Sequence, residues 1–291
     1  MRLKVKSLAS FAMLLPLMAW ADGPAGGTWT WADRPFDGSW VIQPELTTFG
    51  MRSPILSLER GVFRRTDCRT EPIDVPADGA AHGVRGQALF DTISVRVLDP
   101  KRVEVVEKSA DKLAWKGMYT VSANGRAMRL DFEDDRAAKP VTGALEYVRE
   151  GDARAGAHSV SGTWRPEKLT RLSSSGLTVT LAMQRKDAER DLDVAPGPDF
   201  YAAFTLAGSD GRSAEGKLDT HDYPLNGYLP GATIALNRLQ PNILQFNRSQ
   251  NGVLVELTRA MVASDGQTMT LSQIDWVCQA KTVLILNKQA P

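Results

Sequence analysis

Apolar and polar side chains alternate along many short stretches of this chain. Every second residue of Thr92–Val97 is apolar, and similar alternation recurs from Leu113 to Val121 and from Met128 to Phe132. Successive side chains of a β-strand point to opposite faces, so this period is typical of strands that bury one face. No segment after Ala21 keeps a helical period over three turns, and we expect only a brief helical turn at 187–193. We therefore predict an all-β protein.

The strand pattern occurs twice along the chain. One constant shift, which we call the repeat offset, aligns Gly86–Leu130 with Gly227–Leu271 without a gap, and ten of the aligned pairs are identical. Asn-Gly or Asp-Gly dipeptides stand between predicted strands at 124–125, 251–252 and 265–266. They favour two-residue hairpin loops, because both central residues need a positive φ that Gly and Asn adopt readily. Such short loops make neighbouring strands antiparallel.

Each copy also opens with a glycine, a hydroxyl residue and a tryptophan. These openings are Gly38-Ser39-Trp40 in the first copy and Gly162-Thr163-Trp164 in the second. They are separated by less than the repeat offset, so loops of different length must separate the opening from the repeat core. We place one insertion at Lys186–Asp199, which is charged and then rich in Pro and Gly. Pro100 and Pro241 occupy matching turns.

The repeat divides the chain into two units. We predict a first unit at 22–149, a linker at 150–158 that contains two Gly and three Ala, and a second unit at 159–291. A run of antiparallel strands has exposed edges, which closure into a barrel removes. We therefore expect two tandem antiparallel meander units that form small barrels or half-barrels of about six to eight strands each. One continuous sandwich shared by both copies is the alternative.

The segment 1–21 is typical of a secretory signal. Three cationic residues precede the mostly apolar run Leu8–Trp20, and Ala19-Trp20-Ala21 fits cleavage by a signal peptidase after Ala21. A membrane anchor is the alternative, but a span needs about 20 apolar residues. This run is shorter and contains Pro16. We therefore expect a periplasmic or secreted protein whose mature chain has no membrane span.

Charge and cysteine content narrow the possible partners. The formal net charge of +1 becomes −2 without the segment 1–21, which holds three cationic and no acidic residues. Near-neutrality with both signs interspersed argues against nucleic acid as a partner. Cys68 and Cys278 lie in different units, and disulfides persist in exported proteins. A disulfide between them would link the two units, and two buried thiols are the alternative.

Several segments are similar to one known family. The similar segments are Lys217–Gly227, Ala232-Thr233-Ile234, Val262–Thr270, Cys68 with Pro72–Gly79 and Asp91-Thr92, and His158–Arg165. They resemble exported bacterial lipocalin-like proteins of uncharacterised function, over almost the whole chain after Ala21. The resemblance implies a lipocalin-like β-fold and export, and it carries over no functional residue. The family often has a second cysteine just before the one matching Cys68. Arg65 is the nearest candidate here, which leaves Cys278 as the only partner within the chain.

No residue pattern indicates catalysis, so we predict a protein that is not an enzyme. His221 lies beside Asp222 and Tyr223, and His82 lies at the place equivalent to Tyr223. A histidine can act as a general base or a metal ligand when a carboxylate orients it, but in polar turns it is more often solvated. The run Ser173–Gly176 lacks the form of a nucleophile elbow. We expect it to be a loop that leads into a strand at Leu177–Met183.

Metal and cofactor motifs are also missing from the sequence. No Cys/His cluster has zinc spacing, and no Gly-rich loop precedes a helix. The acidic triple Glu133-Asp134-Asp135 could hold calcium weakly, but a solvated turn is the preferred interpretation. Asn247-Arg248-Ser249 fits the glycosylation sequon, which we interpret as chance in an exported bacterial protein. We predict no cofactor.

Aromatic residues supply the functional hypothesis. They either line an apolar pocket or pack in the cores: Trp40, Trp115, Trp164, Phe200, Tyr201, Phe204, Phe246 and Trp276. Barrel mouths are concave and often hold small molecules. We predict non-catalytic binding of a small apolar ligand. The alternative is a structural or protein-interaction module of the cell envelope, which would be marked by a contiguous exposed apolar patch.

Overall fold

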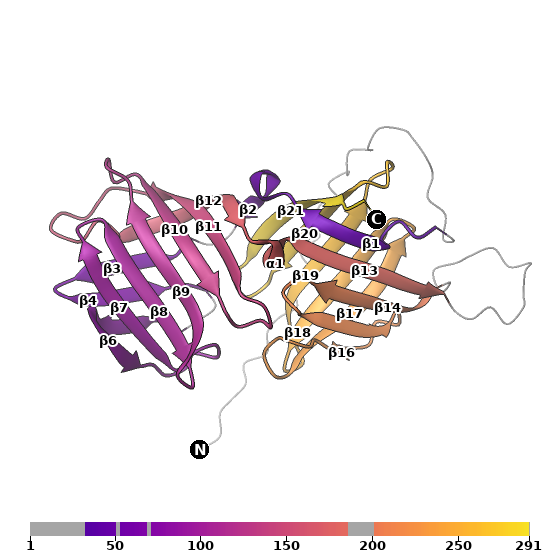
Figure 1. Cartoon of the computed structure of the whole chain (residues 1–291), viewed down its shortest axis with the longest axis horizontal. Helices are drawn as coiled ribbons and strands as arrows, with labels where there is room; N and C mark the ends of the chain where they lie inside the picture. The colour runs from indigo at the N-terminus through magenta and orange to yellow at the C-terminus, as the bar shows by residue number, and fades with distance from the viewer. Residues whose placement is uncertain (1–32, 51–52, 69–70, 186–200, 291) are drawn as a thin grey trace, which may run out of the picture.

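The structure of the protein is a computed structural model that describes residues 33–50, 53–68, 71–185 and 201–290. These residues form two antiparallel sheets, each curled into a nearly closed barrel, and the two barrels lie side by side (Figure 1). The prediction of an all-β protein with two barrel-like units is therefore confirmed. The predicted signal at 1–21, the insertion at 186–199 and the helical turn at 187–193 lie outside the described residues.

Barrel 1 is a sheet of ten strands in the described part of the chain, in the order β5-β4-β3-β12-β11-β10-β9-β8-β7-β6. Its strands are β3 (Ile55–Glu59), β4 (Val62–Thr66), β5 (Ile73–Pro76), β6 (Asp78–Gly83), β7 (Thr92–Asp99), β8 (Arg102–Ser109), β9 (Lys112–Val121), β10 (Ala127–Asp134), β11 (Val141–Glu150) and β12 (Gly162–Leu172). The two edge strands, β5 and β6, follow each other in the chain.

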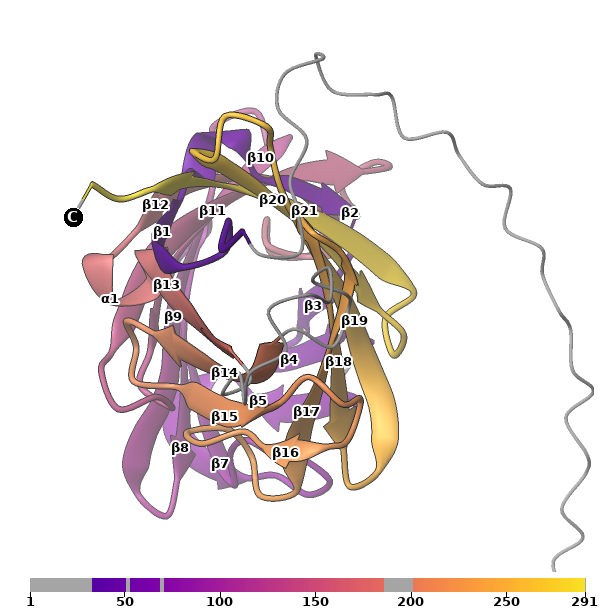
Figure 2. The ribbon, with the colours of Figure 1, turned by 90° about the vertical axis from the view of Figure 1, so that its right-hand side faces the viewer.

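Barrel 2 has the same plan, with the order β15-β14-β13-β1-β21-β20-β19-β18-β17-β16. Its strands are β1 (Gly38–Ile42), β13 (Thr178–Arg185), β14 (Tyr201–Gly208), β15 (Ser213–Lys217), β16 (Tyr223–Pro224), β17 (Ala232–Gln240), β18 (Ile243–Gln250), β19 (Val253–Val262), β20 (Thr268–Asp275) and β21 (Ala280–Lys288). The short strand β2 (Thr48–Gly50) pairs with β21 beside this ring. Ser213 and Asn226 bridge the edge strands, so the ring is nearly complete (Figure 2).

The number of strands exceeds the predicted six to eight, because each barrel has ten among the described residues. The additional strands are the short ones, β3 to β6 in barrel 1 and β15 and β16 in barrel 2. Their alternation is hard to recognise in the sequence because Arg65 in β4 is a charged residue with a mostly buried side chain. A charge at an inward position interrupts the apolar period on which the prediction relied.

The two copies exchange their first strands. β1 carries Gly38-Ser39-Trp40 but pairs with β13 and β21 of the second copy. β12 carries Gly162-Thr163-Trp164 but pairs with β11 and β3 of the first copy. In Figure 1 the indigo β1 therefore lies among the orange and yellow strands of barrel 2. This pairing differs from the expectation that each motif starts its own unit, and it means that each sheet contains a strand from across the predicted linker at 150–158.

Each tryptophan of the exchanged strands is fixed in the same way. The indole Nε1 of Trp40 donates to the carbonyl of Phe36 at 2.8 Å, and that of Trp164 donates to the carbonyl of Val160 at 2.7 Å. Both rings are fully buried. The segment before β1 also contacts β13 and β17, and the segment before β12 contacts β3 and β7. Each segment therefore crosses one end of its barrel, which we call the closed end.

Turns between the strands agree only partly with the sequence prediction. Asn251 and Gly252 both have positive φ and form the expected two-residue loop between β18 and β19. The dipeptides at 124–125 and 265–266 lie instead in five-residue turns. In these turns the side-chain oxygens of Asn124 and Asp265 accept backbone N–H groups two residues later, which stabilises the wider loop.

Helix is confined to two short pieces in the described residues. The 3-10 helix η1 (Pro44–Leu46) connects β1 to β2, and α1 (Ser174–Leu177) connects β12 to β13. The sequence predicted a loop where α1 lies. No helix of the described residues is long and apolar enough to cross a membrane.

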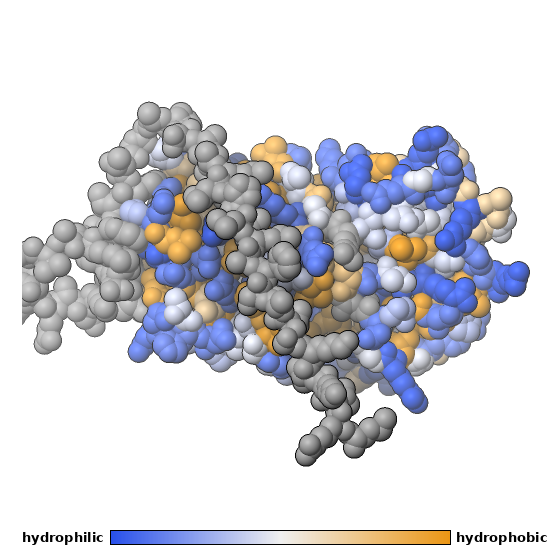
Figure 3. Space-filling model, turned by 180° about the vertical axis from the view of Figure 1, so that it is seen from behind, coloured by the Kyte–Doolittle hydropathy of each residue, from blue (hydrophilic) through white to orange (hydrophobic). Residues whose placement is uncertain are grey.

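The outer surface shown in Figure 3 is mixed. Outside the grey atoms, hydrophobic side chains on this face form separate groups among hydrophilic ones. Large apolar residues with more than a third of their surface exposed include Val253, Trp276 and Val277, at neighbouring ends of β19 and β20. The two interiors hold the main apolar clusters, so the barrels bury most of their large apolar side chains inward.

Candidate ligand-binding site

A cavity of about 990 Å³ lies in barrel 2 and extends to its junction with barrel 1. This volume lies at the upper end of the range of about 300–1,000 Å³ that is usual for small-molecule pockets. Its apolar walls come from β13, β14, β17, β18 and β20 and the segment before β17, and include Leu181, Leu206, Leu225, Ile234, Phe246, Met269 and Leu271. Strands of barrel 2 therefore line a space that is open toward barrel 1 and large enough for a small molecule.

The polarity of the cavity walls changes along the axis of barrel 2. Arg238, Leu244, Ala260, Leu271 and Leu284 follow one another across β17 to β21 in a row near the closed end. The next row brings Thr258 and Gln273 beside Phe246, and the row after that brings Arg248 beside Glu256. Of these four polar residues, Thr258 is buried and all four line the cavity. Arg238 does not line the cavity, so the cavity lining becomes more polar from the closed end toward the opposite end, which we call the mouth.

Barrel 1 has large side chains where barrel 2 has this cavity. The repeat offset relates Trp115 to Glu256 and Phe132 to Gln273, and the strand register preserves both relations. Trp115 lies over Gly117, where an added Cβ would overlap the ring. Threonine replaces this glycine in barrel 2, at Thr258. An aromatic ring seated over a glycine is thus replaced by two polar side chains.

Two further differences reduce the volume that side chains fill inside barrel 2. Tyr119 is buried in barrel 1, and its counterpart is Ala260. Arg65 pairs with the buried Glu107 across the interior of barrel 1 at 2.6 Å, and the counterpart of Arg65 is Leu206. Large side chains that span barrel 1 are therefore replaced by small or medium ones in barrel 2.

Among the described residues, the Arg65–Glu107 pair has no equivalent ion pair in barrel 2. Burial lowers the pKa of Arg65, but the carboxylate of Glu107, together with Tyr119 and Asp67, more than offsets this effect, so the pKa of Arg65 is raised. Burial also raises the pKa of the Tyr119 hydroxyl beside them. Arg248 occupies the place of Glu107, with Leu206 where the partner charge would be. It pairs instead with Glu256 on the neighbouring strand, at 3.0 Å.

The mouth of barrel 2 faces barrel 1. The β14–β15 turn contacts the β10–β11 turn, where Lys139 N donates to the carbonyl of Asp210 at 3.0 Å. Residues of barrel 1 also line the cavity, among them Leu89, Leu113 and Arg136. Figure 2, which looks along both barrels, shows barrel 1 directly behind the ring of barrel 2. Barrel 1 therefore forms part of the wall at the mouth.

Charged residues of both barrels gather at this mouth. We call the following eight cavity-lining residues the charged mouth: Lys112, Asp134, Asp135, Arg136, Asp210, Arg212, Arg248 and Glu256. Burial raises the pKa of Asp134, but the guanidinium groups of Arg136 and Arg212 outweigh it, so the pKa of Asp134 is lowered. Arg212 belongs to barrel 2 and Asp134 to barrel 1, so this electrostatic interaction acts across the junction of the two barrels.

Tyr228 lies among the charged-mouth residues that barrel 2 supplies. The guanidinium of Arg212 stacks over its ring at 4.9 Å from the centroid. Burial of the hydroxyl raises the pKa of Tyr228. The nearby Arg212 lowers this pKa, whereas Asp210 and Glu256 raise it further. Tyr228 lines the cavity although 41% of the residue remains exposed. It therefore stands between the interior of barrel 2 and solvent.

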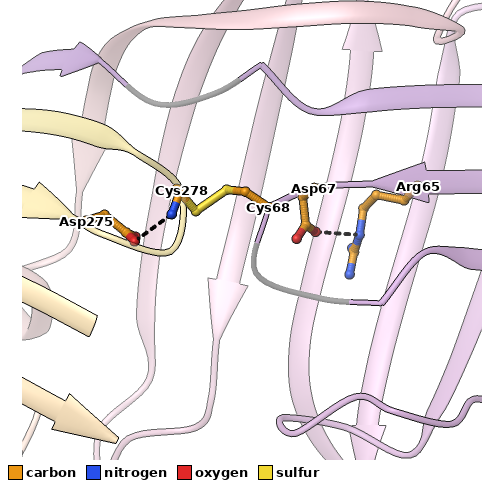
Figure 4. Close-up of a disulfide and its surroundings, with 5 residues drawn as sticks. All are labelled: Arg65, Asp67, Cys68, Asp275 and Cys278. Atoms are coloured by element: carbon orange, nitrogen blue, oxygen red, sulfur yellow. Dashed lines mark hydrogen bonds and ion pairs between the residues drawn. A yellow bond between two sulfur atoms is a disulfide. The ribbon is translucent and has the colours of Figure 1, made fainter. Parts of the chain in front are cut away.

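A disulfide joins the two barrels. Cys68 and Cys278, for which the sequence left both a bond and free thiols open, are bonded, with Cα atoms 5.0 Å apart. Figure 4 shows Cys278 in the turn between β20 and β21, where the Asp275 carboxylate accepts its backbone N–H at 2.9 Å, and Cys68 in the loop after β4. The bond links segments 210 residues apart in the sequence. It holds the two barrels together across their junction.

The two histidines singled out in the sequence lie away from the cavity lining. His82 Nε2 is 2.9 Å from Asp78, and His221 Nδ1 is 3.4 Å from Asp219. The hydroxyl of Tyr223, the counterpart of His82, donates to Asp219 at 2.9 Å, so the repeat preserves this surface contact. Four-fifths of the His221 side chain is exposed. Neither histidine is grouped with a candidate nucleophile among the described residues.

The serine and acidic runs have structural contacts. Ser173 Oγ accepts the backbone N–H of Thr142 at 3.0 Å, and Ser175 Oγ donates to the carbonyl of Pro140. Asp134 pairs with Arg136, and no group of three or more His, Cys, Asp or Glu in the described residues is placed to hold a metal ion. Asn247 of the sequon lies in the middle of β18 and accepts from Gln245 at 3.2 Å.

Most of the aromatic residues that were considered as pocket walls belong to the cores. Trp40, Trp164 and Phe204 are buried, and Trp115 is half-buried inside barrel 1. Trp276 is 48% exposed. Phe246 lines the cavity. Phe200 and the side chain of Tyr201 lie outside the described residues.

Sequence reasoning missed the polar residues that define the mouth. Arg248, Glu256, Thr258 and Gln273 are inward-facing, but a polar residue in a strand is usually assigned to the solvent face. The signal that could have found them is the repeat itself, since each aligns with an inward residue of the first copy. Comparison of the chain with protein-family models and with curated proteins gives no match.

Proposed function

We propose that this chain is an exported, lipocalin-like binding protein that holds a small ligand inside barrel 2. The observation that carries this proposal is the cavity of about 990 Å³, lined by apolar side chains within barrel 2 and by charged ones at its mouth, at a place where the other copy of the same fold has large side chains. Empty apolar space is costly in a protein interior, because its lining loses packing contacts. Occupation by an apolar ligand restores those contacts.

Two features support export. The N-terminal sequence has the cationic and apolar regions of a secretory signal. The Cys68–Cys278 disulfide belongs with an oxidising compartment, because cytosolic thiols are kept reduced. Fractionation of the native host tests this part of the proposal: the protein is expected in the periplasm or medium, with a new N-terminus at Asp22.

Binding is tested with N-phenyl-1-naphthylamine, an uncharged apolar dye whose fluorescence rises in apolar surroundings. We expect saturable binding of one dye per chain. Leu271→Trp places a large side chain in the cavity wall and is expected to weaken dye binding at least about tenfold, a difference of about 1.4 kcal/mol. Ser272→Trp is the matched control, because successive residues of a strand point to opposite faces.

The two variants make the result interpretable. Both add the same side chain to the same strand, so a general effect of tryptophan on folding or on dye fluorescence would appear in both. Circular dichroism checks that each variant keeps its β-structure. Absence of saturable binding by the unaltered protein, or equal binding by Leu271→Trp, contradicts a ligand site inside barrel 2.

An interaction module of the cell envelope is the second candidate function. The observation that favours it is the group of exposed apolar side chains at the neighbouring ends of β19 and β20, which comprises Val253, Leu254, Trp276 and Val277. Exposed apolar groups of this kind often mark protein contacts. Crosslinking in the native host tests this function: a partner captured by the unaltered protein should be lost from Trp276→Ser with Val277→Ser, while dye binding persists.

A further inference from the structure

Opposite charges are equal in number at the mouth of the cavity. Among the described residues that line it, four are cationic and four are acidic. Three guanidinium groups each have a carboxylate partner, in the pairs Arg136–Asp134, Arg212–Asp210 and Arg248–Glu256. The charged mouth therefore has no net charge to offer a ligand, although it is rich in both donors and acceptors.

This balance disfavours a ligand head with a single charge. An anionic head placed beside Arg248 would also lie near Glu256, whose carboxylate is 3.0 Å from the guanidinium. The attraction by one is then offset by repulsion from the other, and the head still loses water on entry. A head that carries both signs, or that both donates and accepts hydrogen bonds, interacts favourably with both members of each pair.

The position of the charges fixes the orientation of a bound molecule. Arg248 and Glu256 lie one register row beyond Phe246 and Thr258, and apolar side chains line the cavity from there toward the closed end. An apolar body therefore fits into barrel 2 first, and the polar head stays at the charged mouth. Arg136 and Asp134 of barrel 1 contact this head from the other side of the junction.

On these grounds we infer that the ligand is an amphiphile without net charge, whose apolar body occupies barrel 2 and whose head lies between the two barrels. This inference rests on the proposed function and narrows it from a small apolar ligand to one class of molecule. It also assigns a role to barrel 1, which supplies four of the eight residues of the charged mouth.

The test compares three molecules that share a ten-carbon chain and differ in the head. They are decyl phosphocholine, which is zwitterionic, decanoate, which is anionic, and decylammonium, which is cationic. Each is used below its micelle concentration to displace N-phenyl-1-naphthylamine from the full chain. The zwitterionic molecule is expected to bind at least about fivefold more tightly than either charged one.

Two charge variants sharpen the result. Glu256→Gln leaves one more cation than acids at the mouth, so decanoate is expected to gain about tenfold relative to decylammonium. Arg248→Gln removes a cation from the same pair and should change this ratio in the opposite direction. Asp210→Asn and Arg212→Gln repeat the comparison at a second pair, in case one of the first variants does not fold.

The outcomes separate the inference from the proposed function. Failure of the unaltered protein to bind the dye rejects the proposed function itself. Dye binding together with a preference for decanoate or decylammonium rejects the uncharged amphiphile and leaves the cavity as a ligand site. A ratio that stays constant in both pairs of variants also rejects the inference, because the head would then not contact the charged mouth.

Discussion

Barrel 1 and barrel 2 share one strand plan and differ in what fills the interior. Ten strands enclose more space than a smaller barrel does, and this space must be filled by side chains or remain available to a ligand. Barrel 1 spans it with Trp115, Tyr119 and the Arg65–Glu107 pair. Barrel 2 has Glu256, Ala260 and Leu206 at the same places. The inward residues therefore determine how much of the interior the protein itself fills.

The comparison also shows what the two copies keep in common. The tryptophan of the exchanged strand, its bond to the carbonyl four residues earlier, and the backbone contact of the closed end occur in both barrels. Leu58 N donates to Ser161 Oγ and Met183 N donates to Asp37 Oδ1, each at 2.8 Å. The closed ends thus stay alike, and the divergence lies toward the opposite ends, where barrel 2 faces its neighbour.

Disruption of the Arg65–Glu107 pair should have the largest effect on stability. Glu107→Gln removes the carboxylate but leaves a buried guanidinium, and we expect a loss of about 3 kcal/mol in the free energy of unfolding. Arg248→Gln changes the equivalent residue of barrel 2, where solvent reaches the ion pair, and should cost at most about 1 kcal/mol. Urea denaturation followed by circular dichroism measures both values.

Equal losses in these two variants would contradict the distinction between a filled and a hollow barrel. Each substitution keeps the side chain polar and places it at the same register position of its strand, β8 or β18. The comparison therefore sets the loss of a buried ion pair beside the loss of a partly exposed one. Salt dependence provides a second measurement, because added salt weakens the partly exposed Arg248 pair more than the buried one.

Periodicity and repetition predicted much of the fold. The alternation in Thr92–Val97 and its match in the second copy correspond to β7 and β17, and the strand register preserves the repeat offset. The exchange of β1 and β12 was not predictable in this way. Gly38-Ser39-Trp40 and Gly162-Thr163-Trp164 have the same local pattern, so nothing in either motif specifies which of two similar barrels it joins.

The cavity could not be predicted from either copy alone. Glu256 and Thr258 alternate with Val255 and Leu257, and this pattern suggests that the apolar pair faces inward. The structure reverses that assignment, because Glu256 and Thr258 line the cavity. A strand whose two faces are both partly apolar does not specify its inward face by hydropathy, and only its neighbours in the sheet decide it.

Truncation of one identical leucine in each barrel sharpens the comparison. Leu130 and Leu271 are equivalent, but Leu130 is buried in a filled core, whereas Leu271 forms a wall of the cavity. Leu130→Ala should cost about 2–5 kcal/mol, because it removes contacts and creates a new void. Leu271→Ala only enlarges an existing space and should cost less than about 2 kcal/mol. Denaturant titration of both variants tests this order.

A reversed order would show that barrel 1 relaxes around a void more easily than barrel 2. The control is Met128→Ala with Met269→Ala, a second equivalent pair of which both members are buried. Because Met269 also borders the cavity, the loss there should again be the smaller one. Agreement between the two pairs would attribute the difference to the interior of each barrel rather than to one residue.

The smallest expected difference lies at the closed ends, where the barrels are most alike. Arg149 stacks over Trp164 at 4.2 Å, and Lys288 lies over Trp40 at 5.2 Å. Arg149→Met should cost about 2 kcal/mol, because Arg149 also donates to three backbone carbonyls, whereas Lys288→Met should cost about 0.5–1 kcal/mol. Methionine keeps an apolar chain over each ring, so denaturant titration reports the loss of charge and donors. Equal costs would mean that the carbonyl bonds of Arg149 add nothing to the cation–π contact that both barrels share.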